Sequence, residues 1–278
     1  MFAGLRTLMT ALVSAMAALS LAGCVEGMFF YPDTRTYTTP EQLGVDARDV
    51  VFDGGEGARL HGWWMPAAGA ARATIVQVHG NAANVSNHAP LVAWLPAHGF
   101  NVLSFDYRGF GRSEGSPTLN GVVADTRAAL AEARRLGGGT PLVVLGHSLG
   151  GATAVRALAE DGTNDVKLLI LDSAFASYRG IARDATSRSL LSLVAPLAVA
   201  GLPPAESDPL AAMARIRTPV LLLHGERDGV IPIAHSERLH AAAVSPARLI
   251  RIPGGQHLDA FSRPALRPEI LAAITAAL

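Results

Sequence analysis

Short apolar runs bounded by glycine and proline recur along the chain and constrain its fold more than any other feature. Each run is rich in Val, Ile and Leu. Continuous apolar runs of this length predict parallel strands that are buried on both faces of a sheet. The six runs are 73–79, 100–106, 141–145, 167–172, 219–224 and 247–252.

Segments with a helical spacing of apolar residues lie between these runs. In residues 120–136, Val122, Leu130 and Ala133 fall on one face. Alternation of strands and helices predicts an α/β fold with right-handed crossovers and helices on both faces of the sheet. The other helical segments are 88–98, 149–160, 234–244 and 264–277.

Two further segments complete the predicted architecture. Residues 48–53 and 59–65, joined across Gly54 and Gly55, predict an initial antiparallel pair of strands. Later, 46 residues (173–218) separate two predicted strands, whereas a crossover needs only about a dozen or somewhat more. The excess is apolar and compatible with helix, so we expect a cap over the carboxyl edge of the sheet.

Composition supports one large folded domain and excludes some partners. Of the 278 residues, 50% are apolar and 17% charged, with 23 basic and 23 acidic side chains. No basic field exists to hold nucleic acid, so a nucleic-acid partner is not expected. The single cysteine, Cys24, excludes an intramolecular disulfide and a multi-cysteine zinc site. We expect no cofactor and no metal ion.

The first 24 residues have the pattern of an export signal. Arg6 precedes an uncharged apolar stretch that is short for a membrane-spanning helix. The stretch ends in Leu-Ala-Gly-Cys, which resembles the bacterial lipobox. We therefore expect cleavage after Gly23 and acylation of Cys24; an ordinary signal or an uncleaved anchor with a chance cysteine is the alternative. Val25 at the next position implies sorting to the outer membrane in a Gram-negative cell.

This interpretation divides the chain into a signal peptide (1–23), a lipidated tether (24–44) and a folded domain (45–278). The protein is then anchored to the cell envelope through Cys24, and the membrane is its expected partner. The sequence does not indicate an oligomeric state.

A strand-to-helix turn carries the strongest chemical signal. Gly146-His147-Ser148-Leu149-Gly150 fits G-x-S-x-G after one predicted strand and at the start of a helix. We expect Ser148 in a strained backbone conformation that exposes its hydroxyl. Glycines two positions before and after it are expected because those positions crowd each other. The helix N-terminus then points at the reacting centre.

A serine nucleophile needs a histidine base. His257 lies in a flexible loop between the last strand and the last helix, from which it can reach Ser148, and we select it from nine histidines. Of the others, His79, His147 and His224 are predicted to be structural or to line the site. Surface positions are predicted for His61, His88, His98, His235 and His240.

The acid that orients the base should follow a strand between Ser148 and His257. Asp228, four residues past the strand 219–224, is the favoured candidate. Asp172, at the end of the preceding strand, is the rival. Asp259 lies close to His257 but is expected to cap a helix.

The substrate oxyanion needs two N–H donors. One is the backbone N–H of Leu149, directly after the nucleophile. The other is the N–H of Asn81 in His79-Gly80-Asn81, a tight turn after the strand 73–79.

Together these motifs resemble those of the α/β-hydrolase superfamily, in particular the branch labelled serine-aminopeptidase-like. The resemblance covers residues 45–278 and implies a mostly parallel sheet of about eight strands flanked by helices, with a helical cap inserted after the sixth strand. It also implies that Asp106-Tyr107-Arg108-Gly109 shapes a turn and is not catalytic. The motifs are HGN (79–81), FDYRGFGRSEG (105–115), GHSLGG (146–151), HGERDGVIP (224–232) and GGQHLDAF (254–261).

The expected activity is hydrolysis of small-molecule acyl esters through an acyl-enzyme on Ser148. A serine peptidase or amidase and a non-catalytic, lipid-anchored binding protein are the alternatives. Residues 189–204 carry no charge and are expected to form an apolar wall that selects small to medium uncharged acyl groups. Arg179 and Arg183, which precede this wall, either face an anionic head group or lie on a solvated helix face.

Overall fold

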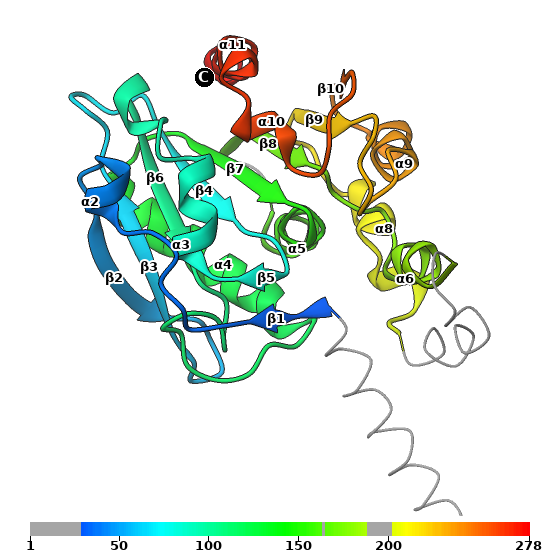
Figure 1. The fold of residues 1–278 in the computed structure, drawn as a ribbon, viewed down its shortest axis with the longest axis horizontal. Coiled ribbons are helices and arrows are strands. Elements are labelled where there is room, and N and C mark those ends of the chain that lie inside the picture. The colour runs from blue at the N-terminus through cyan, green and yellow to red at the C-terminus, as the bar shows by residue number, and fades with distance from the viewer. Residues whose placement is uncertain (1–28, 163–164, 188–201) are drawn as a thin grey trace, which may run out of the picture.

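The computed structural model describes residues 29–162, 165–187 and 202–278, and its centre is one eight-stranded sheet (Figure 1). The strands follow the order β10-β9-β8-β7-β4-β6-β3-β2. Their bounds are Arg48–Asp53 (β2), Arg59–Met65 (β3), Ala73–Val78 (β4), Phe100–Phe105 (β6), Leu142–His147 (β7), Val166–Asp172 (β8), Val220–Gly225 (β9) and Ala247–Ile252 (β10).

All neighbouring strands from β6 to β10 are parallel, as the continuous apolar runs predict. The pair β2–β3 is antiparallel, which confirms the predicted initial pair, and β3 also runs antiparallel to β6. Because the parallel strands all end at the same edge, the loops after β4, β7, β8 and β9 meet there. This edge carries the candidate site.

Helices cover both faces of the sheet, as predicted. On one face α4 (Gly121–Gly137), α5 (Leu149–Asp161), α8 (Pro209–Met213) and α9 (Ala234–Ala242) share a buried core with the strands. On the other face, α10 (Asp259–Ser262) and α11 (Arg267–Ala277) pack with Val92 and Leu95 in a second core. The α/β-hydrolase fold class is thus the observed one.

The predicted helix over 88–98 is wrong. A short helix, α3 (Val85–His88), is followed by separate 3₁₀ turns at Ala89–Leu91 and Pro96–His98. Pro90 and Pro96 lack a backbone N–H and clash with the preceding turn, so a continuous α-helix cannot form.

The insertion after the sixth strand of the sheet, β8, lies where the cap was predicted. Its described part includes α6 (Tyr178–Ser187), a 3₁₀ turn at Ala205–Ser207 and α8. Most of the apolar run 189–204 lies outside the described residues. Arg179 is half-buried, and its guanidinium donates to the carbonyl oxygens of Leu202 and Pro203, each at 3.1 Å.

Residues 29–44 belong to the segment that the sequence predicts as a tether, yet they pack on the domain. Tyr31–Pro32 (β1) pairs in parallel with Ala82–Ala83 (β5), and α2 (Pro40–Leu43) follows with Thr39 as its cap. Figure 1 shows β1 beside β5, the short strand that follows β4. We call residues 29–37 the strap.

Candidate active site

Ser148 occupies the turn between β7 and α5, where its backbone has φ 55° and ψ −118°. This left-handed conformation is unfavourable for a residue with a side chain. The Ser148 N–H donates to the carbonyl oxygen of Asp172 at 2.8 Å, which ties the turn to the neighbouring strand β8. The side chain therefore projects from a fixed point at the start of a thirteen-residue helix.

Two glycines permit this turn. A Cβ atom on Gly150 would lie 1.9 Å from the carbonyl oxygen of Val78, at the end of β4. A Cβ atom on Gly146 would lie 2.4 Å from Cα of Gly151. A Cβ atom on Gly146 would also lie 2.7 Å from the carbonyl oxygen of Gly150, which agrees with the predicted crowding between these two positions. The approach of β4 is a second reason for glycine at 150.

The structure brings His257 and Asp228 together. Nδ1 of His257 lies 2.8 Å from Oδ2 of Asp228. Oδ1 of Asp228 accepts from the N–H groups of Val230 and Ile231 at 2.8 and 2.9 Å, so the carboxylate is fixed at both oxygens. Because Nδ1 faces a carboxylate, Nε2 of His257 is left as the nitrogen that can accept a proton.

Asp228 is buried, with 8% of its surface exposed. Burial raises its pKa, but the hydrogen bonds from His224 and His257 outweigh burial and hold the pKa well below its usual range. Nε2 of His224 faces the carbonyl oxygen of Ile231 and Oδ2 of Asp228, both acceptors, so this nitrogen carries the proton. His224 is therefore the structural histidine that the sequence predicted.

The rival acid points elsewhere. Oδ2 of Asp172 lies 3.1 Å from Nδ1 of His147, and both side chains are fully buried. Asp259 is the first residue of α10, where its carboxylate accepts from the N–H of Gln256 and pairs with Arg263. The predicted capping role is wrong, because the N-cap residue of α10 is Leu258 and no side chain forms a cap hydrogen bond there.

The loop that carries His257 lies beside the serine turn. The N–H of Leu258 donates to Oγ of Ser173 at 3.3 Å, and Ser173 follows Asp172, the residue bonded to the Ser148 N–H. No hydrogen bond joins Ser148 to His257 in the described part of the chain. Such a bond is often long before substrate binds.

Asn81 and Leu149, the predicted oxyanion donors, line the same cavity as Ser148. Neither backbone N–H donates to a backbone acceptor in the turns and loops that the structure describes. Leu149 opens α5, so its N–H is one of the free donors at a helix N-terminus.

The cavity has a volume of about 230 Å³ and an apolar lining. One wall comes from α6, a helix within the predicted cap insertion, and a second comes from the loop after β9. The third wall is formed by Phe29 and Tyr31 of the strap, and the sequence analysis did not predict it. The aromatic run 29–31 within the predicted tether was the signal that could have indicated it. The other lining residues are Phe175, Ile181, Ala182, Ala185, Val230 and Ile231.

Three histidines predicted at the surface are buried. His61, His88 and His235 are each less than 8% exposed. His61 and His235 bind Asp49 and Asp184 at 2.8 Å, and His88 binds the carbonyl oxygen of Ala82 at 3.0 Å. These partners, which lie 12, 51 and 6 residues away in the sequence, allow the polar rings to enter the interior.

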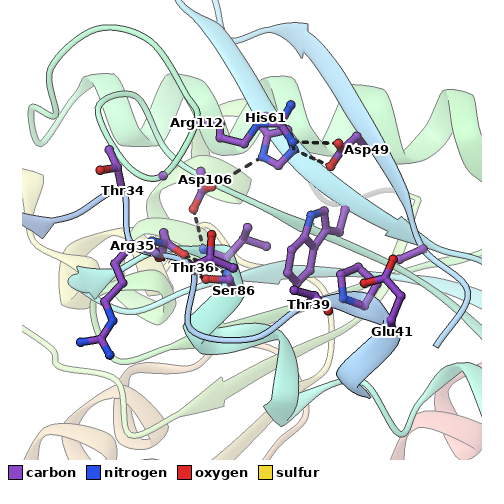
Figure 2. A pocket seen from close by; sticks show the side chains of 16 residues that line it. Thr34, Arg35, Thr36, Thr39, Glu41, Asp49, His61, Ser86, Asp106 and Arg112 are labelled. Carbon is purple, nitrogen blue, oxygen red and sulfur yellow. Dashed lines mark hydrogen bonds and ion pairs between the residues drawn. The ribbon is translucent and has the colours of Figure 1, made fainter. Parts of the chain in front are cut away.

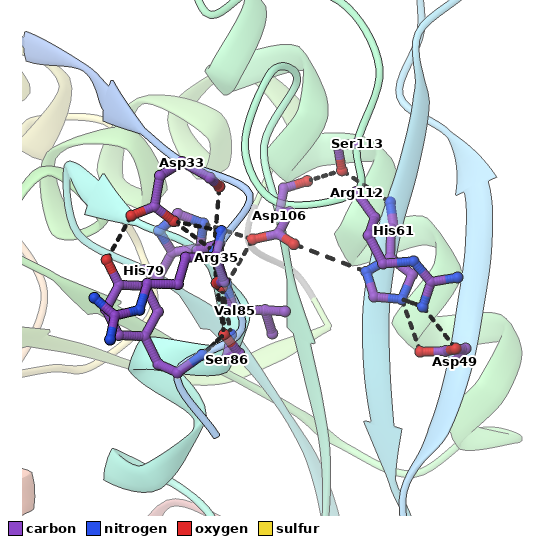
Figure 3. Close-up of polar contacts among 12 residues, drawn as sticks. Asp33, Arg35, Asp49, His61, His79, Val85, Ser86, Asp106, Arg112 and Ser113 are labelled. Carbon is purple, nitrogen blue, oxygen red and sulfur yellow. Dashed lines mark hydrogen bonds and ion pairs between the residues drawn. The ribbon is translucent and has the colours of Figure 1, made fainter. Parts of the chain in front are cut away.

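A separate hollow of about 360 Å³ lies on the side of β2 and β3 (Figure 2). Its floor contains His61, with Nε2 2.8 Å from Asp49 and Nδ1 3.8 Å from Asp106 (Figure 3). Neither Ser148 nor His257 lines this hollow. Ser86, one of the hydroxyl groups in its lining, donates to Asn84 and not to a histidine.

The fold, the strained serine turn and the order of the elements define an α/β hydrolase. Solved structures agree: an esterase of Pyrococcus furiosus has a TM-score of 0.73 at 20% identity and covers 90% of this chain and 97% of its own. Est1E of Butyrivibrio proteoclasticus, with ferulic acid bound, has a TM-score of 0.65 at 21% identity and covers 81% and 99%.

The chain belongs to the serine aminopeptidase S33 family, whose model matches residues 69–211. It is 41% identical over 240 residues to the uncharacterized protein YfhR of Escherichia coli, which spans 84% of this chain and 80% of the relative. It is also 31% identical over 215 residues to a lysophosphatidylserine lipase of Xenopus tropicalis, covering 73% of this chain and 54% of the lipase.

Proposed function

We propose that the protein is a serine hydrolase that cleaves uncharged acyl esters, with Ser148 as nucleophile, His257 as base and Asp228 as the orienting acid. The observation that carries the proposal is one cavity lined by Ser148, by both candidate oxyanion donors and by apolar side chains. The pairing of His257 with a buried, ionised Asp228 supports it.

The reaction would proceed in two halves. His257 accepts the hydroxyl proton of Ser148 through Nε2 while the serine oxygen attacks the acyl carbon, and Asp228 favours the imidazolium that forms. The N–H groups of Asn81 and Leu149 stabilise the oxyanion. The imidazolium gives its proton to the departing alcohol, and a water molecule, deprotonated by the same histidine, then hydrolyses the acyl-enzyme.

The lining favours esters over peptides with a free amino terminus. An aminopeptidase needs an acidic group to bind the substrate ammonium, and the described lining of the cavity contains no carboxylate. Residues 188–201, which follow α6 in the sequence, also contain no Asp or Glu. The lipase and esterase names of the compared proteins point in the same direction.

We propose further that residues 1–23 are removed and that Cys24 is acylated, so that the hydrolase is anchored to the cell envelope. The support is the uncharged stretch that ends in Leu-Ala-Gly-Cys. Within residues 29–162, 165–187 and 202–278, no helix has the length and hydropathy needed to cross a bilayer. Mass spectrometry of the mature N-terminus tests this, and an unmodified Cys24 would exclude it.

Labelling with a fluorophosphonate tests the catalytic assignment. The purified protein should react covalently at Ser148, and Ser148→Ala should abolish both labelling and hydrolysis of nitrophenyl esters while the melting temperature stays close to that of the parent. Absence of labelling in a folded parent would favour the non-catalytic binding protein. Faster cleavage of aminoacyl amides than of any ester would favour the peptidase.

A further inference from the structure

The strap is hydrogen-bonded to the loop after β4, which carries Asn81, a proposed oxyanion donor. The N–H of Tyr31 donates to the carbonyl oxygen of Asn81 at 2.8 Å, and the N–H of Asp33 donates to Ala83 at 3.3 Å. The side-chain amide of Asn84 donates to Oδ1 of Asp33 and to the carbonyl oxygen of Arg35, each at 2.8 Å. Figure 3 shows Asp33 and Arg35 beside Ser86 and Asp106.

Aromatic packing fixes the strap more firmly than these bonds alone. Phe30 is 5% exposed, and its ring lies 6.3 Å from that of Phe110 at a near-perpendicular angle. The ring of Phe29 meets Tyr178 at 5.5 Å and Phe175 at 6.3 Å. Burial of one phenylalanine side chain contributes about 1.5–3 kcal/mol, so the strap is a stable part of the domain.

One rim of the active-site cavity is apolar and exposed. Phe29 and Tyr31 line the cavity, and Val230 lines it from the loop after β9. Tyr31 is 59% exposed and Val230 is 56% exposed. They are two of the six large apolar side chains that are exposed in the part of the chain the structure describes. Exposed apolar groups around a cavity are typical of a surface that meets a partner or a membrane.

The short segment between Cys24 and the strap limits how far this rim can lie from a lipid anchor on Cys24. Phe29 lies five residues after Cys24. Five residues span at most about 18 Å even when fully extended. A tether over residues 24–44 would reach about 70 Å by the same measure. If Cys24 is acylated, the cavity wall at Phe29 therefore lies no more than about 18 Å from the bilayer surface.

We propose that the strap is a membrane-facing wall of the active site, through which the enzyme takes the acyl chain of an ester embedded in the bilayer. The inference rests on the proposed hydrolase activity and on acylation of Cys24. Tyr31 and Val230 meet the lipid surface, Phe29 contacts the incoming chain, and the chain passes from the bilayer to Ser148 without crossing water. Because basic side chains do not outnumber acidic ones, no net positive charge attracts the protein to anionic lipid, and the anchor and the apolar rim hold this orientation.

A spacer tests the geometry without touching any described contact. A flexible Gly-Ser segment of about 20 residues, inserted between Gly27 and Met28, releases the domain from the surface. The matched control carries the same insertion between Gly138 and Gly139, in the turn after α4, where neither glycine has a neighbour within 4 Å of a built Cβ atom. The acylated full chain is reconstituted in phosphatidylcholine vesicles that contain methylumbelliferyl oleate, with methylumbelliferyl butyrate as the substrate in solution.

We expect the spacer after Gly27 to lower the rate of oleate hydrolysis by about three- to tenfold. A longer linker lowers the effective concentration of the active site at the bilayer surface. The butyrate rate should not change, and the control insertion should change neither rate. An unchanged ratio of the two rates in the spacer variant would overturn the inference. A parent that labels with fluorophosphonate on no serine and cleaves neither ester would instead refute the proposed function.

Side-chain variants test the wall itself. Phe29→Ala should lower kcat/KM for the vesicle ester several-fold more than for butyrate, whereas Val244→Ala, another exposed apolar position (55% exposed) outside the cavity lining, should leave the ratio unchanged. If Phe29 only stabilised the fold, both rates would fall together with the melting temperature. That outcome would contradict the role of the strap in substrate selection.

Discussion

Nδ1 of His257, in the loop after β10, lies 2.8 Å from Oδ2 of Asp228, which follows the end of β9 by three residues. The rival carboxylate, Asp172, contacts His147 instead, at 3.1 Å. The two carboxylates thus pair with two different histidines, although they lie at the carboxyl ends of the adjacent strands β8 and β9.

Asp228→Asn should lower kcat by roughly 10³–10⁴-fold, because an amide in place of the carboxylate no longer stabilises the imidazolium or holds the required tautomer. Asp172→Asn is the matched control, since it makes the same chemical change at the end of the neighbouring strand; it should cost less than tenfold. Steady-state kinetics on a nitrophenyl ester, with melting temperatures for both variants, measure the difference. A larger loss in Asp172→Asn would transfer the acid role to that residue.

Tyr31 supplies a backbone N–H to Asn81 and a ring to the cavity, and two variants separate these contributions. Tyr31→Ala keeps the N–H, whereas Tyr31→Pro removes it. We expect kcat for the soluble butyrate ester to fall about tenfold further in Tyr31→Pro than in Tyr31→Ala, because the oxyanion donor at Asn81 loses its support.

The rate of fluorophosphonate labelling should fall in parallel with kcat, since that reagent also forms an oxyanion. A purely structural role of the Tyr31 N–H predicts a different result, namely a lower melting temperature with equal kcat in the two variants. That result would remove Tyr31 from the positioning of the oxyanion loop.

The sheet could be predicted from the sequence because its signals are local. Runs of Val, Ile and Leu between glycine and proline identify strands, and the turn around Ser148 depends on glycines within a few positions. The order of the three site residues likewise follows from which strand each one succeeds. These features need no knowledge of distant partners.

The strap and the buried histidines depend on contacts across the chain and so could not be predicted in the same way. Phe30 meets Phe110, and His235 meets Asp184, at sequence separations of 80 and 51 residues. A short extended segment with one proline has no periodicity that distinguishes a docked strap from a free tether. Only the aromatic run at 29–31 hinted at burial.

Burial of His88 should make stability depend on pH. Removal from water lowers its pKa from the ordinary value of 6.5 to about 4, despite the hydrogen bond to Ala82. In the unfolded chain the His88 imidazole binds a proton near pH 6.5, whereas in the folded protein it does so only near pH 4. The free energy of unfolding therefore falls as the pH decreases from about 6.5 to about 4. For a shift of this size the loss is about 3 kcal/mol.

Urea unfolding of the parent and of His88→Gln between pH 7 and pH 4 measures this effect. The glutamine retains a donor for the Ala82 carbonyl but does not titrate, so the variant should lose part of the pH dependence. His79, whose pKa burial also lowers, should account for part of what remains. Identical slopes in parent and variant would show that His88 does not contribute.

The last prediction concerns Arg108, in the segment Asp106-Tyr107-Arg108-Gly109 that follows β6. Its guanidinium contacts Asp125 of α4 at 2.8 Å, and its backbone N–H donates to the same carboxylate, also at 2.8 Å. Asp125 is fully buried, so Arg108→Ala leaves a carboxylate without its partner and should reduce the free energy of unfolding by about 3–5 kcal/mol. Arg135→Ala, which breaks the exposed pair with Glu132, should cost less than about 1 kcal/mol. Because Arg108 is absent from the cavity lining, the folded fraction of Arg108→Ala should still label with fluorophosphonate at the parent rate. A loss of labelling in folded protein, without loss of stability, would instead assign Arg108 to the active site.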